Sequence, residues 1–330
     1  MGVYLSSPIT TKKSQAGQNS KLRYGFTEMQ GWRNSMEDAH ICHLNFDSKK
    51  ECSLFGIFDG HGGQQAALIA KKYFVNYLIK NKNFQKGNME VALKETFIEL
   101  DKFILSQEGK IEMFKLTHCK KNKKFAFIFL YQNNLNKLKI ENQPFEQSDL
   151  QKIQAGCTAN VVLIQKDIIY VANCGDSRTV LCQNGYGYEL SEDHKPELPR
   201  ERERIEKIGG IIEDGRINKS LNLSRSLGDP QLKNNPNYSL EEQLVIPVPD
   251  ISKKKIKKEE DEFLLIACDG IWECMSQQQT ITFVKEKIQD KKKTDLTKVL
   301  GQLFDKNLAQ NTNQIYGCDN MSAILVLFQQ

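Results

Sequence analysis

The chain has 330 residues, of which 39% are hydrophobic and 26% are charged, and these proportions exclude a fibrous or wholly disordered protein. Its apolar runs are much shorter than the roughly 18 residues of a membrane span, so we expect a soluble chain. The net charge of +5 is the difference between 46 basic and 41 acidic residues, too small an excess to indicate nucleic-acid binding without a clustered basic face.

Residues 1–20 are polar and show no apolar periodicity, so we predict a mobile N-terminal arm and expect order to begin near Leu22. Beyond this arm, short runs rich in β-branched and aromatic residues predict β-strands. Most of these runs are joined by short polar turns, which favour antiparallel pairing. The runs occupy residues 21–29, 39–46, 51–58, 158–165, 167–174, 178–183, 262–268 and 321–328.

Helical patterns lie between and after these strands. Stripes of apolar residues at helical spacing, within residues 67–78, 93–104 and 296–304, predict helices that pack against a sheet. Ser276 and Gln279 resemble a capping box and mark the start of another helix.

The order of these elements indicates the fold class. Strands and helices come in blocks without regular βαβ alternation, which predicts an α+β fold in which helices cover antiparallel sheets. We interpret residues 21–330 as a single domain, with an insertion around residues 107–154.

The stretch LFGIFDGHGG, residues 54–63, is the first that suggests chemistry, because Asp59 follows an apolar run and precedes three glycines. These glycines do not complete G-x-G-x-x-G, and the chain contains no G-x-x-x-x-G-K-[ST] motif, so a nucleotide-binding loop has no support. Two interpretations remain open for Asp59: an ordinary Asp-Gly turn, or a carboxylate that binds a metal ion beside a backbone carbonyl.

Further acids occupy similar places at the ends of predicted strands, which favours the metal interpretation. They are Glu37, Asp38, Asp176, Asp269 and Asp319. Carboxylates that are brought together in a protein repel each other unless cations neutralise them. Oxygen ligands of this kind favour Mg²⁺ or Mn²⁺ over zinc, so the acids predict a two-metal hydrolytic site.

These acids belong to longer stretches, which are, in chain order, YGFTEMQGWRNSMEDAH, FGIFDGHGG, GCTANVV, VANCGDSR, LSEDHKP, RINKSLNLSRSLGD, FLLIACDGIWE and GCDNMSAILV. In this order they resemble the motifs of the protein phosphatase 2C family, the metal-dependent serine/threonine phosphatases. The resemblance runs from about Leu22 to Phe328, which is nearly the whole chain.

The resemblance implies a β-sandwich of two antiparallel sheets flanked by helices, in α-β-β-α layers. It also implies two Mg²⁺ or Mn²⁺ ions at one end of the sandwich. By family role, Asp59 would bridge the two ions, and the carbonyl of Gly60 would bind one of them. Asp269 and Asp319 would bind the other ion.

The same resemblance implies roles for the remaining acids. Glu37 and Asp38 would hold metal-bound waters. Asp176, together with Glu273, would contribute to a third and weaker metal position. Glu273 departs from the family pattern, because aspartate is frequent at this place.

The implied activity is hydrolysis of phosphoserine and phosphothreonine in proteins, by in-line attack of a water that bridges the two ions. Uncatalysed hydrolysis is so slow that a single acid or base, worth about 10²- to 10⁴-fold, cannot suffice. Arg33 suits the phosphoryl oxygens because its planar guanidinium donates two parallel hydrogen bonds. His61 is placed to give a proton to the departing serine or threonine oxygen.

Two other classes of function are alternatives to this one. A cysteine phosphatase is excluded because none of the nine cysteines is followed by arginine six positions later. A catalytically inactive, phosphatase-like binding module is the alternative, and it would be expected to have lost a ligand acid, whereas Asp59, Asp269 and Asp319 are all present. We expect phosphorylated proteins as partners, no nucleic acid, and a monomer.

The first residues, MGVYLS, fit M-G-x-x-x-[ST], which makes Gly2 a candidate for N-myristoylation. One acyl chain binds membranes only marginally, so Lys12, Lys13, Lys21 and Arg23 would have to assist. Scattered cysteines without a C-x-x-C pair, and the lack of a secretory signal, indicate a reducing intracellular compartment. We therefore expect a cytoplasmic protein with reversible peripheral membrane association.

Overall fold

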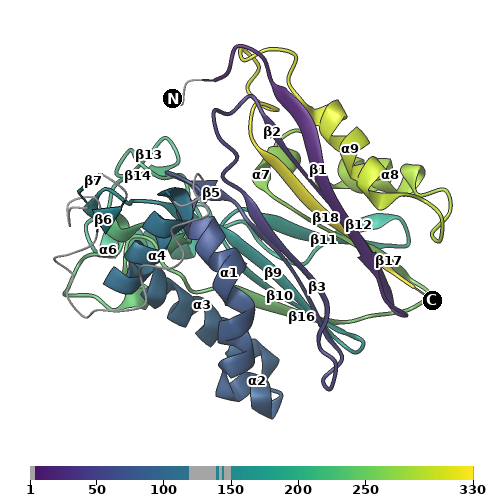
Figure 1. Cartoon of the computed structure of the whole chain (residues 1–330), viewed down its shortest axis with the longest axis horizontal. Helices are drawn as coiled ribbons and strands as arrows, with labels where there is room; N and C mark the ends of the chain where they lie inside the picture. The colour runs from purple at the N-terminus through teal and green to yellow at the C-terminus, as the bar shows by residue number, and fades with distance from the viewer. Residues whose placement is uncertain (1–3, 119–138, 141–142, 145–149, 330) are drawn as a thin grey trace.

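The structure is a computed structural model that describes residues 4–118, 139–140, 143–144 and 150–329 of the chain. Two antiparallel β-sheets face each other at its centre (Figure 1). The first sheet contains, in spatial order, β1 (Ile9–Gln18), β2 (Leu22–Gly31), β18 (Met321–Phe328), β17 (Asp261–Ala267), β11 (Arg178–Gln183) and β12 (Tyr186–Glu189). The second contains β16 (Asp250–Lys255), β10 (Ile168–Cys174), β9 (Ala159–Gln165), β4 (Cys52–Phe58) and β3 (Ala39–Asp47).

Strand β18 shows how one stretch of sequence serves two layers. Its side chains alternate between the two faces of the sheet, as the two-residue period of a strand requires. Ile324 and Val326 lie in the core between the sheets, whereas Ala323 and Leu325 lie in the core on the outer face of the same sheet. Because both faces are buried, the strand is apolar along most of its length, and each large aliphatic side chain contributes about 1.5–3 kcal/mol.

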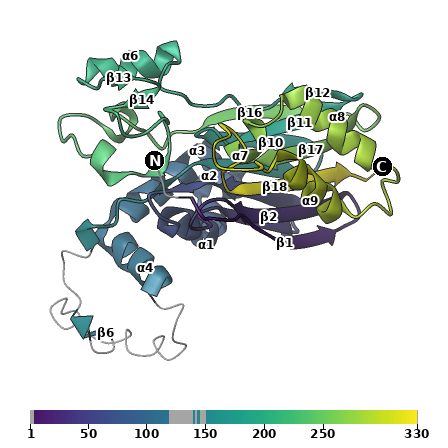
Figure 2. The ribbon, with the colours of Figure 1, turned by 90° about the horizontal axis from the view of Figure 1, so that it is seen from above.

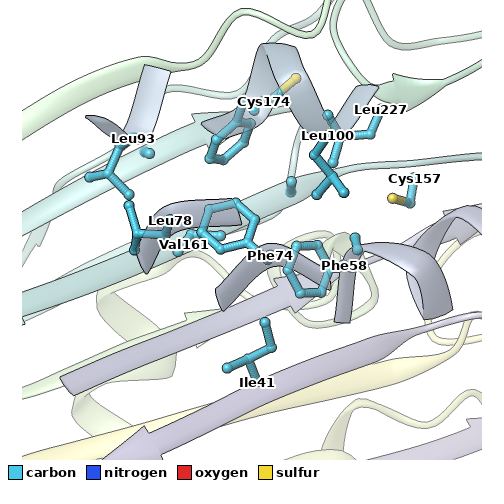
Figure 3. Packing of buried hydrophobic residues seen from close by; sticks show 14 of the residues in the cluster. Ile41, Phe58, Phe74, Leu78, Leu93, Leu100, Cys157, Val161, Cys174 and Leu227 are labelled. Carbon is cyan, nitrogen blue, oxygen red and sulfur yellow. The ribbon is translucent and has the colours of Figure 1, made fainter. Parts of the chain in front are cut away.

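Helices α1 (Gln65–Lys80), α2 (Lys82–Lys86) and α3 (Met89–Leu105) cover the outer face of the five-stranded sheet, and α4 (Gln107–His118) packs on α1 and α3. Figure 3 shows Phe74 and Leu78 of α1, with Leu93 and Leu100 of α3, in the core between these helices and the sheet. The two predicted helical stripes in this part of the chain are therefore buried helix faces.

Helices α8 (Gln277–Lys287) and α9 (Leu296–Asn307) cover the other sheet, and the short helix α7 (Asp269–Trp272) precedes them. Ser276 caps α8 in a capping box with Gln279, as predicted. Leu300 and Leu303 of α9 are fully buried in the adjoining core. The predicted fold class, a β-sandwich of two antiparallel sheets flanked by helices, is confirmed.

The prediction of a mobile arm over residues 1–20 is wrong for residues 9–18. These residues form β1, the edge strand of the six-stranded sheet, and pair antiparallel with β2 (Figure 1). An edge strand is stabilised mainly by backbone pairing on one side, together with contacts such as that of Lys12 Nζ with Asp305 of α9 at 2.5 Å. Its side chains are mostly exposed, so apolar periodicity does not reveal it.

A further group of elements lies beyond one end of the sandwich (Figure 2). It contains α6 (Pro199–Lys207), β13 (Ile212–Glu213) and β14 (Arg216–Ile217), and two 3₁₀ turns follow at Pro230–Leu232 and Leu240–Glu242.

The segment 107–154, interpreted above as an insertion, is described only in part. It begins with α4, and β6 (Lys139–Ile140) pairs with β7 (Gln143–Pro144) within it. Residues 119–138, 141–142 and 145–149 lie outside the described residues. Within the part of the chain that the structure describes, no helix has the length and apolar character needed to cross a membrane.

Candidate active site

Three short strands bring distant stretches of the chain together where β4 ends and β9 begins. β5 (Gly60–His61) and β15 (Leu227–Gly228) both pair antiparallel with β8 (Gly156–Cys157), which lies between them. Asp59 joins β4 to β5; its amide donates to the Thr158 hydroxyl at 3.1 Å, and its carbonyl accepts the Thr158 amide at 2.8 Å. The position of Asp59 is therefore determined by the backbone pairing of the sheets.

A cleft of about 740 Å³ opens at this edge of the sandwich. Carboxylates from segments at this edge of both sheets line it, most of them directly before or after a strand. The acids named from the sequence that line the cleft are Glu37 before β3, Asp59 after β4, Asp176 between β10 and β11, Asp269 and Glu273 in and after α7, and Asp319 before β18.

These acids raise one another's pKa values. Burial, with the charges of Asp38 and Asp269, raises the pKa of Asp59 well above its ordinary value. Burial likewise raises the pKa of Asp269 well above its ordinary value, with added repulsion from Asp176 and Asp319. Carboxylates in this condition fit a divalent cation, because its charge would offset both the burial and the repulsion.

Asp38 lies behind the wall of the cleft rather than on it. Its side chain is buried, and among the described residues neither carboxylate oxygen has a hydrogen bond of good geometry, although the Ser322 hydroxyl and the Cys268 thiol lie close enough to lower its pKa. Burial, with the charge of Asp319, raises the pKa of Asp38 to about 7. A buried carboxylate without well-formed hydrogen bonds is costly, so it fits a position beside an ordered water or a cation.

The donor atoms of the cleft indicate which metals would fit. Oxygens of Asp59 and Asp269 lie within 4.8 Å of each other and of the sulfur of Cys268, a residue that the sequence analysis did not consider. Burial raises the pKa of the Cys268 thiol well above its ordinary value, and its sulfur accepts the amide of Ser322 at 3.2 Å. Because a protonated thiol is a poor ligand, the oxygens favour hard cations such as Mg²⁺ or Mn²⁺.

Arg33 reaches the cleft from the segment that follows β2. Its Nη2 donates to Asp319 Oδ2 at 2.5 Å, and 45% of its side chain is exposed. Asn320 holds this segment in place, because its side-chain amide donates to the carbonyls of Gln30 and Ser35 at 2.8 and 3.0 Å. The guanidinium therefore lies beside the acids, on the accessible side of the cleft.

Two hydrogen bonds hold the carboxylate of Glu37 in place. Its carboxylate accepts the Ser35 hydroxyl at 2.7 Å and the amide of Gly63, just before α1, at 2.9 Å. Gly60 makes the close approach of this segment feasible, because a Cβ at position 60 would lie 2.4 Å from the Glu37 carbonyl oxygen.

His61 faces a carboxylate from a distant part of the chain. Its Nε2 lies 2.8 Å from both Oδ1 and Oδ2 of Asp229, whose side chain is almost fully buried. Burial lowers the pKa of His61, but the charge and hydrogen bond of Asp229, together with the charges of Asp176 and Glu37, outweigh this effect and the pKa is raised. Gly156 lies directly against the pair, because a Cβ there would be 2.2 Å from Asp229 and 2.4 Å from His61.

Asp176 and Glu273, implied for a third metal position, both line the cleft. The carboxylate of Asp176 is buried and accepts a hydrogen bond from the ammonium of Lys195. Burial raises the pKa of Glu273, with added repulsion from Asp176. The Lys195 charge partly neutralises Asp176, a contact that the sequence analysis did not anticipate.

The structure thus gathers most of the residues singled out from the sequence. Asp38 lies behind the cleft, and Gly2 lies outside the described residues. Sequence reasoning missed Asp229, Asn320 and Lys195, although each belongs to a quoted motif, and membership of those motifs was the signal that could have found them. The predicted site residues that line the cleft are Arg33, Glu37, Asp59, Gly60, His61, Asp176, Asp269 and Asp319.

Comparison with known proteins extends the likeness over the whole chain. The model of the family protein phosphatase 2C matches residues 22–140 and 110–315. The chain is 42% identical over 332 residues to probable protein phosphatase 2C 2 of Paramecium tetraurelia, covering 100% of both. It is 42% identical over 338 residues to probable protein phosphatase 2C 21 of Arabidopsis thaliana, covering 100% of this chain and 93% of the relative.

Solved structures share the fold. A phosphatase from a pathogenic strain of Toxoplasma gondii superposes with a TM-score of 0.72 at 23% identity, covering 97% of this chain and 96% of that one. The serine-threonine phosphatase 2C from Toxoplasma gondii gives a TM-score of 0.70 at 19% identity, covering 99% of each chain.

Fold and cleft together define a layered sandwich of two antiparallel sheets, the fold of these solved structures, with a cleft lined by acids near the strand ends. The likeness to relatives along the full chain then establishes the family: the chain belongs to the protein phosphatase 2C family. It is a protein serine/threonine phosphatase, and its family is metal-dependent.

Proposed function

We propose that the cleft hydrolyses phosphoserine and phosphothreonine in protein substrates, with two bound Mg²⁺ or Mn²⁺ ions. The cluster of carboxylates carries this proposal, because burial and the charges of neighbouring acids raise the pKa values of Asp59 and Asp269, and cations would offset both effects. Bound ions would lower the pKa of a water towards about 7 and shield the charge of the phosphoryl group.

The proposed ligands are those that the family resemblance implies, and the fact that their residues line the cleft supports them. Asp59, the carbonyl of Gly60, Asp269 and Asp319 would hold the two ions. Glu37 and Asp38 would hold ordered waters beside them, and the oxygens of Asp38, which lack well-formed hydrogen bonds among the described residues, support this role. A weaker third ion would lie at Asp176 and Glu273, where it would compete with the Lys195 ammonium.

Arg33 would bind the phosphoryl group of the substrate. Its guanidinium lines the cleft and has five N–H groups. One N–H of Nη2 donates to Asp319, and the others are the donors that this role would use. A planar pair of N–H groups matches two phosphoryl oxygens, so Arg33 would orient the phosphate against the acids.

His61 would donate the proton to the departing serine or threonine oxygen. Both ring nitrogens carry a proton in the acid form, so Nε2–H can pair with Asp229 while the other N–H donates. The charge of Asp229 raises the pKa of His61, which favours this acid form near neutral pH. An inactive binding module, the alternative, has no observation in its favour.

Release of phosphate from a phosphothreonine peptide tests this function. We expect turnover with Mg²⁺ or Mn²⁺, loss of turnover with a chelator, and recovery when metal is restored. Asp59→Asn should lower kcat by more than about 100-fold, because even residues that only support metal ligands contribute about 10- to 100-fold. Asp305→Asn, on the exposed surface of α9, is the matched control and should retain full activity.

Turnover that does not depend on metal, or full activity of Asp59→Asn, would contradict the two-metal proposal. A folded chain that binds phosphoproteins without releasing phosphate would favour the inactive module instead.

A further inference from the structure

A buried ion pair lies beside the loop that carries Asp229. Asp101 belongs to α3, and Lys233 follows the 3₁₀ turn after Asp229. Lys233 Nζ donates to Asp101 Oδ1 at 2.8 Å, and both side chains are 0% exposed. A buried ion pair often stabilises a protein no more than apolar residues of similar shape would. Stability alone therefore does not explain why this pair is present.

The pair holds the loop on both sides of Asp229. On the upstream side, Asp101 Oδ1 accepts the amide of Gly228 at 2.7 Å. From the downstream side, Lys233 Nζ reaches back and donates to the carbonyl of Ser226 at 2.8 Å. One carboxylate of α3 therefore anchors the residue before Asp229 and, through Lys233, the end of the loop.

Asp229 needs such an anchor because of its backbone conformation. Its φ of 54° and ψ of 56° lie in the left-handed region, which residues other than glycine seldom adopt. In this conformation its carboxylate accepts the Ser226 hydroxyl and meets His61 Nε2 with both oxygens at 2.8 Å. The orientation of the imidazole therefore depends on where the loop holds Asp229.

We propose that Asp101 and Lys233 are positioning residues for His61. The inference rests on the proposed function, in which His61 gives a proton to the leaving oxygen. Both residues act through the Asp229 loop and not on the reacting atoms. A loosened loop would leave the acids and Arg33 in place, and it would slow mainly the step in which the leaving oxygen needs a proton.

The variants Asp101→Asn and Asp101→Asn/Lys233→Met test this inference. Asparagine keeps an acceptor for the Gly228 amide but removes the charge that holds Lys233. The double variant leaves no unpaired buried charge, which protects its folding. Each variant is assayed on a phosphothreonine peptide, whose alkoxide needs a proton, and on p-nitrophenyl phosphate, whose phenolate leaves without one.

For both variants we expect kcat on the peptide to fall about 10-fold. This loss is smaller than the whole rate enhancement of about 10²- to 10⁴-fold that a general acid supplies, because His61 itself is still present. KM for the peptide should not change, and kcat on p-nitrophenyl phosphate should stay within about two-fold of the unaltered chain. A role in stability alone would not separate the two substrates in this way.

Asp261→Asn is the matched control, because Asp261 is a buried carboxylate at the opposite end of β17 from Asp269 and accepts from Gln183 at 2.6 Å. It should change the rate on neither substrate. An equal fall on both substrates in the Asp101 variants, or no change on either, would overturn the inference and leave the proposed function standing. Absence of turnover by the unaltered chain would overturn the proposed function and this inference together.

Discussion

At the scale of single residues, the cleft depends on side chains that are far apart in the sequence. His61 and Asp229 are 168 positions apart, yet they meet at 2.8 Å over Gly156. Arg33 and Asp319 are 286 positions apart and form an ion pair. Such contacts set the orientation and the pKa of the side chains in the cleft. The residue type alone does not determine either property.

The variant Asp229→Asn tests the electrostatic part of the His61 assignment. Asp229 raises the pKa of His61, so its replacement by a neutral amide should lower that pKa. A reaction that needs protonated His61 would then lose rate at a lower pH than in the unaltered chain. The measurement is kcat on the phosphothreonine peptide as a function of pH. If the fall in kcat at high pH occurs at the same pH as in the unaltered chain, or at a higher pH, the result argues against the assignment.

At the scale of elements, one ionic network ties the segment beyond the sandwich to the second sheet. Glu201 of α6 is 1% exposed and pairs with Arg204 and with Arg225, each at 2.5 Å. Arg225 also pairs with Asp250 of β16 at 2.8 Å. Because Arg225 stands four residues before Asp229, this network anchors the chain just upstream of the Asp229 loop.

Glu201→Gln should destabilise the fold in a way that depends on pH. Burial opposes ionisation of Glu201, but its two arginines hold its pKa at about 2, against an ordinary 4.5. The resulting stability, about 3 kcal/mol, is complete above about pH 4.5 and is lost as pH falls through about 2. At pH 7 the variant should lose about 3–5 kcal/mol of folding free energy, because Arg204 and Arg225 lose the carboxylate that they share.

Urea unfolding of Glu201→Gln and of the unaltered chain, at several pH values, measures this effect. The difference between the two free energies of unfolding should shrink as pH falls from about 4.5 to about 2. A difference that stays constant over this range would show that the ion pairs are not its source.

Most of the strands in the two large sheets that could be predicted from the sequence lie between two neighbours, and the edge strand β3 is the exception. Central strands such as β18 and helices such as α3 bury a continuous face, so their apolar periodicity is strong. Within the two large sheets, the strands that were missed are β1, β12 and β16, and all three lie at sheet edges. An edge strand needs few apolar side chains, since backbone pairing on one side stabilises it.

At the scale of the whole molecule, the sandwich is a rigid support for acids at its strand ends. The acids of the cleft could be predicted from the sequence because most of them lie next to an apolar run that forms a strand. Strands that pair in one sheet bring the acids at their ends close together. The partners Asp229 and Lys195 could not be assigned in this way, because their contacts depend on the packing of separate segments. Asp101 did leave a local sign, a charged residue directly after Leu100 on a buried face of α3.

In the function that we propose, the cleft holds two divalent cations between Asp59, Asp269 and Asp319. A crystal of the protein grown with Mn²⁺, measured for anomalous scattering by manganese, tests it most directly. We expect two peaks in the cleft, with Asp59 in contact with both, and loss of at least one peak in Asp59→Asn. A cleft without manganese, or peaks bound only to residues outside it, would contradict the claim.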